Sequence, residues 1–217
     1  MSSQPVQHDQ LPETLPIFPL RALLFPRGSL PLVIFEPRYL NMLDDAMVSH
    51  EMIGMIQPLG GERGRPIVAN IGCAGYIETY DETEDGRYHI SLRGICRFKT
   101  AVELDVQTPY RQVLADYSSF HDDFKAPDTS DLPDRLRIEA ALQIYMDRTA
   151  GGIAPQATAF RDTPYETLVN VVSMSCQFRP IDQQALLEAK SLKERTEILI
   201  KLLSTFGGTD RTTGYTQ

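Results

Sequence analysis

The fold is decided by one stretch of sequence, LPIFPLRALLFPRGSLPLVIFEPRYL, which runs from Leu15 to Leu40. Its apolar segments are short and are separated by proline and glycine, a pattern typical of β-strands joined by tight connections. The segment Leu15 to Leu20 carries two prolines, which predicts an edge strand or a bulged strand because proline cannot donate to a sheet ladder. The segment Leu32 to Phe35 predicts a short buried strand.

Outward from this stretch, the pattern changes to a single helix and then returns to strands. Pro37 presets φ for a first helical turn, and apolar residues at helical spacing continue to Met47. The dipeptide Asp85-Gly86 predicts a tight turn between two strands, and the Gly- and Arg-rich residues 60–66 predict a loop. Further strands are predicted at 52–57, 67–80, 88–93, 102–106 and 112–117.

The second half of the chain reads as helical. Two sequences predict capping boxes at helix starts, Thr163-Pro164-Tyr165-Glu166 and Ser191-Leu192-Lys193-Glu194. The chain is therefore expected to comprise a β-rich part at 11–121, a polar linker at 122–131, a helical part at 132–207 and a flexible tail at 208–217. The predicted fold class is α+β, with one helix inserted among the strands.

Composition narrows the class of protein. Of the 217 residues, 42% are hydrophobic, which is ordinary for a globular protein. Residues Met1 to Gln10 show no secretory signal, and the longest strongly apolar run, Leu30 to Phe35, is far too short to span a bilayer. The three cysteines are scattered and form no metal or disulfide pattern. A cytoplasmic protein with no membrane association is expected, and the net charge of -8 opposes non-specific binding to nucleic acid.

Several motifs occur in a fixed order along the chain: Leu15-Pro16-Ile17-Phe18-Pro19-Leu20, Leu24-Phe25-Pro26, Leu30-Pro31-Leu32, Ile34-Phe35-Glu36-Pro37-Arg38-Tyr39, and the later Ile90-Ser91-Leu92-Arg93-Gly94 with Arg97-Phe98. Together they resemble the N-terminal, substrate-binding domain of Lon-type proteases. The resemblance covers about 11–206 and implies a PUA-like β pseudo-barrel followed by a helical bundle. It also implies recognition of protein substrates, and this function extends to an adaptor role in protein quality control. No Gly-x-x-x-x-Gly-Lys-[Ser/Thr] loop is present, so the resemblance implies neither an ATPase nor a protease domain in this chain.

Catalytic and metal-binding patterns are weak. No Gly-x-Ser-x-Gly elbow is present, and Ser191 with Lys193 cannot form a catalytic pair because positions i and i+2 point to different sides of a helix. His121-Asp122-Asp123 lacks a second ligand cluster nearby in sequence. Glu36 and Arg38 favour a structural ion pair over a functional site. We therefore expect no enzyme activity, no metal and no cofactor.

Two surfaces remain as candidate binding sites. Residues Leu23, Leu24, Phe25 and Pro26 lie in a connection between two strands, where apolar side chains either tuck against the barrel or form an exposed patch. We predict that this loop contacts unfolded or extended polypeptide. The alternative is RNA binding through a basic strand face, formed by Arg87, His89, Arg93 and Arg97. The acidic net charge disfavours RNA, whereas the identity of the protein partner and the oligomeric state stay open.

Overall fold

The structure is a computed structural model that describes residues 7–62, 64–149 and 162–205. The chain divides after Ala126 into two compact units. The first unit is dominated by strands and the second by helices, which confirms the predicted α+β class. The predicted tail at 208–217 lies outside the described residues. No helix in the described part is long and apolar enough to cross a membrane.

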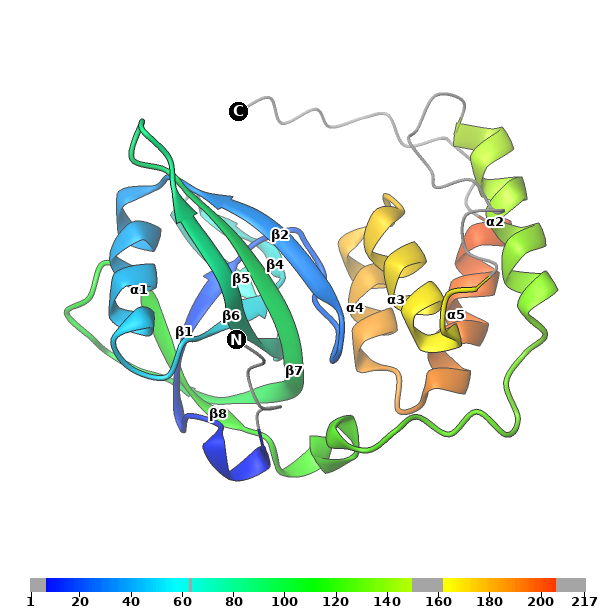
Figure 1. Ribbon diagram of the computed structural model, residues 1–217, viewed down its shortest axis with the longest axis horizontal. Coiled ribbons are helices and arrows are strands. Elements are labelled where there is room, and N and C mark those ends of the chain that lie inside the picture. Colours follow the sequence, from blue (N-terminus) through cyan, green and yellow to red (C-terminus); the bar gives the residue numbers. More distant parts are fainter. Residues whose placement is uncertain (1–6, 63, 150–161, 206–217) are drawn as a thin grey trace. The chain divides into compact units, whose positions relative to one another are not determined.

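The first unit is built on a curved sheet of six strands (Figure 1). Their order across the sheet is β2-β7-β6-β3-β1-β8, and a further pairing of β7 with β8 closes the sheet on itself. The strands are β1 (Thr14–Pro19), β2 (Ser29–Ile34), β3 (Met52–Ile56), β6 (Ile71–Glu82), β7 (Tyr88–Glu103) and β8 (Arg111–Asp116). A separate hairpin of β4 (Pro58–Glu62) and β5 (Arg65–Val68), the helix α1 (Pro37–Met47) and the 3-10 helices η1 (His8–Gln10) and η2 (Ser118–Phe124) complete the unit.

The long hairpin of β6 and β7 forms where the sequence predicted a turn. Thr83 N–H donates to the Arg87 carbonyl at 2.8 Å, and Gly86 adopts the left-handed φ of 76° that tight turns require. Along β7, Ile90 and Leu92 are buried while His89 is exposed, as expected for alternating faces of a strand.

Strand β1 departs from its prediction. It is not an edge strand, because it pairs in parallel with β3 and antiparallel with β8. The two neighbours are staggered along it: β8 pairs with residues 14–17 and β3 with residues 17–19. Pro16 therefore has a ladder partner only in β8, and Pro19 only in β3. This stagger lets an interior strand carry two residues that lack an N–H.

The barrel core is centred on Phe98, whose side chain is fully buried. A Cβ atom added at Gly72 would lie 2.7 Å from the Phe98 ring, and one at Gly54 would lie 3.0 Å from it. These glycines therefore make room for the aromatic ring. Helix α1 begins at Pro37 as predicted, and its buried residues are Tyr39, Met42, Leu43 and Ala46.

The hairpin of β4 and β5 replaces the loop that the sequence predicted at 60–66. Gly60, Gly61 and Gly64 all have positive φ values, so the chain can reverse within a few residues and pair Glu62 with Arg65. The backbone freedom of glycine, from which the sequence analysis predicted a loop, allows a tight hairpin at this position.

The second unit is a helical bundle of α2 (Arg135–Thr149), α3 (Tyr165–Ser175), α4 (Pro180–Glu188) and α5 (Leu192–Thr205). Helix α5 contacts each of the other three, and Leu199 and Leu203 on it are fully buried. Arg195, also on α5, is 5% exposed; its guanidinium donates to the Leu186 carbonyl and to Asn170 Oδ1. Because each partner lies on another helix, this one side chain ties α3 and α4 to α5.

Of the two predicted capping boxes, one forms in part and the other does not form: at Ser191 the side-chain cap is present, but Glu194 Oε2 accepts from Lys190 N–H instead of from Ser191 N–H. Ser191 Oγ accepts a hydrogen bond from Glu194 N–H at 3.1 Å, as predicted for the start of α5. At α3 the N-cap residue is Pro164, one position after Thr163, and no side-chain cap bond forms there. Proline has no side-chain oxygen, so it cannot accept a bond from the first amide groups of the helix.

The start of the predicted linker, residues 122–124, belongs to η2 instead. Asp123 in η2 is 6% exposed and forms an ion pair with Arg97 of β7 at 2.8 Å. A polar segment that reads as a linker is thus attached to the barrel, because its carboxylate satisfies a buried cation.

Candidate functional site

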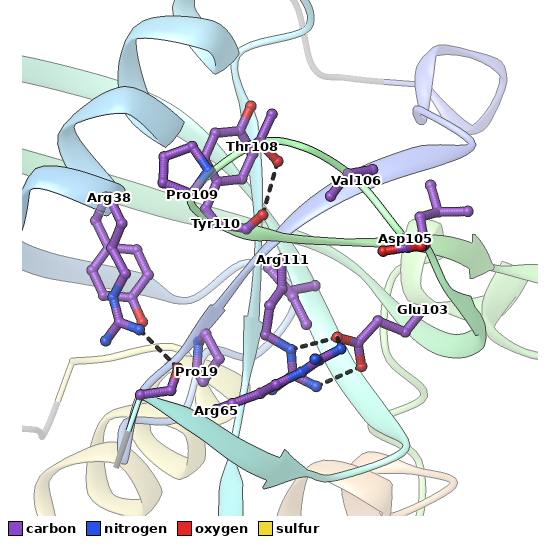
Figure 2. A pocket seen from close by; sticks show the side chains of 14 residues that line it. Pro19, Arg38, Arg65, Glu103, Asp105, Val106, Thr108, Pro109, Tyr110 and Arg111 are labelled. Carbon is purple, nitrogen blue, oxygen red and sulfur yellow. Dashed lines mark hydrogen bonds and ion pairs between the residues drawn. The ribbon is translucent and has the colours of Figure 1, made fainter. Parts of the chain in front are cut away.

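The first unit contains a cleft of about 250 Å³ that brings together four parts of the chain (Figure 2). These are the end of β1, the first turn of α1, the hairpin of β4 and β5, and the connection from β7 to β8. Its lining residues are Ile17, Pro19, Arg38, Tyr39, Gly64, Arg65, Glu103, Leu104, Asp105, Val106, Thr108, Pro109, Tyr110 and Arg111. The cavity is large enough for one or two side chains of a ligand.

The connection from β7 to β8 is held in place by its own hydrogen bonds. Tyr110 donates its hydroxyl proton to Asp45 Oδ2 of α1 at 2.6 Å, and Thr108 Oγ1 donates to the Tyr110 carbonyl at 2.9 Å. At the start of the connection, Leu104 N–H donates to the Gln112 carbonyl at 2.9 Å. The wall of the cleft is therefore ordered before any ligand arrives, which lowers the entropy cost of binding.

Arg111 occupies the centre of the cleft and faces Glu103 (Figure 2). Its Nε and Nη2 donate to the two Glu103 carboxylate oxygens at 2.8 and 2.6 Å, and its Nη1 donates to the Pro66 carbonyl at 2.7 Å. This bidentate pair keeps both groups ordered. The hydrogen bonds from Arg111 lower the pKa of Glu103, so that carboxylate stays ionised. Arg65 lies beside them with its side chain 83% exposed, 3.8 Å from Glu103.

Arg38 forms a second anchor on the opposite side of the cleft. Its Nε and Nη2 donate to Glu36 Oε2 at 3.1 and 2.8 Å, and its Nη1 donates to the Gly64 carbonyl at 2.9 Å. The interpretation of Glu36 and Arg38 as an ion pair is confirmed. The pair also connects α1 to the β4–β5 hairpin, so Arg38 and Arg111 together hold this hairpin against the cleft.

Three titratable groups of the cleft have shifted pKa values that hold them in one charge state near pH 7. Burial and the hydrogen bond to Asp45 raise the pKa of Tyr110 to about 12, and burial raises the pKa of Tyr39. Both phenols therefore stay neutral at pH 7, while Glu103 stays charged. None of these groups exchanges a proton near neutral pH, as a general acid or base would. Among the described residues no cluster of three His, Cys, Asp or Glu side chains could hold a metal ion.

The loop predicted to contact polypeptide is part of the barrel core. Leu23, Leu24 and Phe25 are 2%, 1% and 0% exposed, and Pro26 is also buried, so of the two alternatives the loop tucks against the barrel and forms no exposed patch. The receiving surface is formed by Gly75 and Gly94, which face each other across β6 and β7. A Cβ atom at Gly94 would lie 2.0 Å from the Phe25 carbonyl oxygen, and one at Gly75 would lie 2.7 Å from Leu24 Cδ2. The absence of two side chains thus creates the recess that the loop fills.

The basic strand face is largely neutralised. Arg87 pairs with Asp85, and Arg93 pairs with Glu78 at 2.5 Å. Arg97 was expected on the same face of β7 as Arg93, but η2 covers it and its side chain is only 8% exposed. His89 remains on the surface. With each arginine next to a carboxylate, little positive charge is available to phosphates, and the alternative of RNA binding through this face gains no support.

Most residues of the cleft were missed by the sequence analysis. In the sequence, Arg65 is more than thirty positions away from Val106 and Arg111. Only the closed sheet brings these three residues together at the cleft. One signal was present: residues 107–111, which lie between two predicted strands, combine Pro109 with the polar Thr108 and the charged Arg111. Connections of this kind lie at the surface and often carry binding residues.

The closed sheet, the helical bundle and the pre-ordered cleft define a small α+β binding domain. The chain matches the ATP-dependent protease La (LON) substrate-binding domain over residues 14–205, and it belongs to this family. The family resemblance inferred from the opening motifs is thereby confirmed.

Solved structures share the fold of this chain, and curated relatives resemble it in sequence. The structure is similar to a Lon N-terminal domain protein from Xanthomonas campestris, with a TM-score of 0.60 and 20% identity, covering 87% of this chain and 97% of that one. It is also similar to the N-terminal domain of Mycobacterium avium complex Lon protease, with a TM-score of 0.59 and 16% identity, covering 88% and 98%. Lon protease 2 of Myxococcus xanthus is 24% identical over 92% of this chain and 24% of its own length. Lon protease of Desulfosudis oleivorans is 35% identical over 42% of this chain and 12% of its own length. The chain thus spans a quarter or less of these two relatives.

Proposed function

We propose that this protein is a non-catalytic module that recognises unfolded or extended polypeptide, and that the cleft between α1, the β4–β5 hairpin and the β7–β8 connection seats part of the bound segment. The observation that carries the proposal is the chemistry of the cleft: a largely polar lining, ordered by the ion pairs of Arg38 and Arg111, with a few half-buried apolar side chains beside it. The half-buried Pro19 and Val106 can cover an apolar side chain, while the exposed Arg65 can reach a carboxylate or a backbone carbonyl.

Membership of a substrate-binding family supports the same class of ligand. The cleft is small, so it can bury only one or two side chains of a ligand. The free energy gained by that burial is little more than the entropy cost of association, and we expect weak binding with a Kd of about micromolar. Weak contact suits a module that must accept many sequences. RNA gains no support, because the arginines of the strand face are paired with carboxylates.

The test is fluorescence anisotropy with a labelled test protein that is kept unfolded by blocking its cysteines, compared with the same protein in its native fold. The wild-type chain should bind the unfolded form and leave the native form alone. Val106→Glu, which puts a charge at one of the apolar positions of the cleft, should weaken binding at least about fivefold. The matched control is Val48→Glu, at an 87% exposed position after α1. Equal binding of the unfolded and native forms, or none at all, contradicts the proposal.

The proposal extends to an adaptor role in protein quality control, in which the bound polypeptide is passed to a separate protease. A lysate depleted of this protein should then degrade the unfolded test protein more slowly. Adding back the wild-type chain should restore the rate, and adding back Val106→Glu should not. Unchanged degradation after depletion would rule out the adaptor role while leaving polypeptide binding intact.

A further inference from the structure

Strand β2 forms an open edge of the sheet. One side of it pairs antiparallel with β7, from Ser29 opposite Arg93 to Ile34 opposite Tyr88. On its other side β2 pairs with no strand in the part of the chain that the structure describes (Figure 1). Strand β8, which closes the sheet, pairs only with the second half of β7, from Lys99 to Glu103, and so leaves this edge uncovered.

The register shows which backbone groups face the open edge. Gly94 N–H donates to the Gly28 carbonyl at 2.8 Å, and Gly28 opposite Gly94 continues the β2–β7 register. Because hydrogen-bonded pairs alternate along an antiparallel ladder, the even-numbered residues of β2 bond to β7. Ser29, Pro31 and Val33 therefore direct their backbone groups away from β7. Pro31 fits this assignment, since its missing N–H falls on the unpaired side.

The side chains along this edge are apolar without interruption. Every residue from Leu30 to Phe35 is apolar. On the outer face Val33 is 43% and Phe35 is 63% exposed, while Leu30 and Leu32 on the inner face are half-buried. Proteins usually protect such edges with lysine, a bulge or a covering segment, because an open apolar edge pairs with other chains. Between Leu30 and Phe35 the only such device is Pro31.

From these observations we infer that the open edge of β2 binds an extended, continuously apolar segment of a polypeptide, which adds to the sheet as a further strand. The edge supplies carbonyls at Ser29, Pro31 and Val33 and N–H groups at Ser29 and Val33. Only another peptide backbone matches these groups at strand spacing. Apolar side chains flank both faces of the added strand, so the segment it accepts is apolar at consecutive positions, as in the exposed core of an unfolded protein. The inference rests on the proposed function and adds a second contact surface to the cleft.

A second copy of this chain fits the edge less well. If β2 paired with its own copy in the register centred on Pro31, the two prolines would face each other and both hydrogen bonds of that central pair would be lost. A foreign strand still donates an N–H to the Pro31 carbonyl. The edge therefore favours a segment whose residue opposite Pro31 is not proline.

The experiment uses the whole chain and a fluorescein-labelled peptide whose central residues are all Val, Ile or Leu and whose ends each carry one Lys and one Glu. Wild type should bind this peptide, and a version N-methylated at every central residue should bind at least about tenfold more weakly, since its side chains remain but its backbone donors are gone. Val33→Lys should weaken binding of the unmethylated peptide by a similar factor. Val48→Lys adds the same charge at an exposed position outside the sheet and should bind like wild type.

Each other outcome overturns the inference. If neither the peptide nor the unfolded test protein binds, both this inference and the proposed function fail. If Val33→Lys and N-methylation leave binding unchanged while Val106→Glu weakens it, the cleft is the contact surface and the β2 edge is not. If sedimentation shows a dimer that Val33→Lys dissociates, the occupant of the edge is a second copy of this chain.

Discussion

Two apolar segments lie close together near the start of the chain, and they differ in burial: one is buried in the barrel and the other is partly exposed. The loop from Leu23 to Pro26 connects two strands, yet all of it is buried. The segment that follows, from Leu30 to Phe35, consists of β2 and the residue after it, yet Val33 and Phe35 are exposed. The prediction that Leu32 to Phe35 is a buried strand is therefore wrong for these two side chains. The loop is buried because glycines on β6 and β7 leave a recess for it. The strand is exposed because, in the described part of the chain, no strand pairs with its outer edge. Apolar character alone thus does not decide burial; the surface that receives the segment does.

The sharpest test of this contrast replaces one phenylalanine in each segment. Phe25→Ala removes a fully buried ring and should lower the free energy of unfolding by about 3–5 kcal/mol. Phe35→Ala removes a ring that is 63% exposed and should change it by no more than about 0.5 kcal/mol. Urea denaturation of both variants measures the difference. Similar losses for the two would mean that the segments are not distinguished as the structure shows.

A second test concerns η2, where another segment with surface-like composition is buried. Asp123→Ala leaves the Arg97 guanidinium buried without its carboxylate and should destabilise the fold by about 3 kcal/mol. Asp122→Ala, one residue earlier, removes a carboxylate that is 81% exposed and should cost no more than about 0.5 kcal/mol. Thermal melts of the pair show whether η2 belongs to the barrel. Equal melting temperatures of the two variants would mean that residues 122–124 belong to the linker and do not pack on the barrel.

A third test fills the recess instead of emptying it. Gly94→Ala places a Cβ atom against the Phe25 carbonyl, so the loop must move and the fold should lose about 1–3 kcal/mol. Thr79→Ala, at an exposed position of β6, serves as the control. If Gly94→Ala proved as stable as wild type in urea, the glycine would not be what admits the loop.

The smallest expected effect is at the open edge itself. Val33→Lys should change the free energy of unfolding by at most about 0.5 kcal/mol, because the side chain is on the outer face and its N–H takes no part in the β7 ladder. The same substitution at Leu24, 1% exposed, should prevent stable folding, since it buries a charge in the core. A large loss for Val33→Lys would show that the edge is covered in the native protein.

The sequence by itself determined the features that depend on neighbouring residues. The α+β class, the helix that begins at Pro37, the turn at Asp85-Gly86 and the cap at Ser191 are all set by local backbone preferences and short hydrogen bonds. Family membership also followed from the sequence, because the opening motifs are long and occur in a fixed order.

Only the tertiary structure decided which apolar and charged groups are accessible. The recess at Gly75 and Gly94, the burial of Arg97 under η2 and the open edge of β2 each depend on which distant segments meet. The same holds for the cleft, where Arg111 meets Glu103 and the β4–β5 hairpin only after the sheet has closed. A side chain is buried only when another surface packs on it. The sequence pattern of a segment describes that segment and does not show which distant segment will cover it.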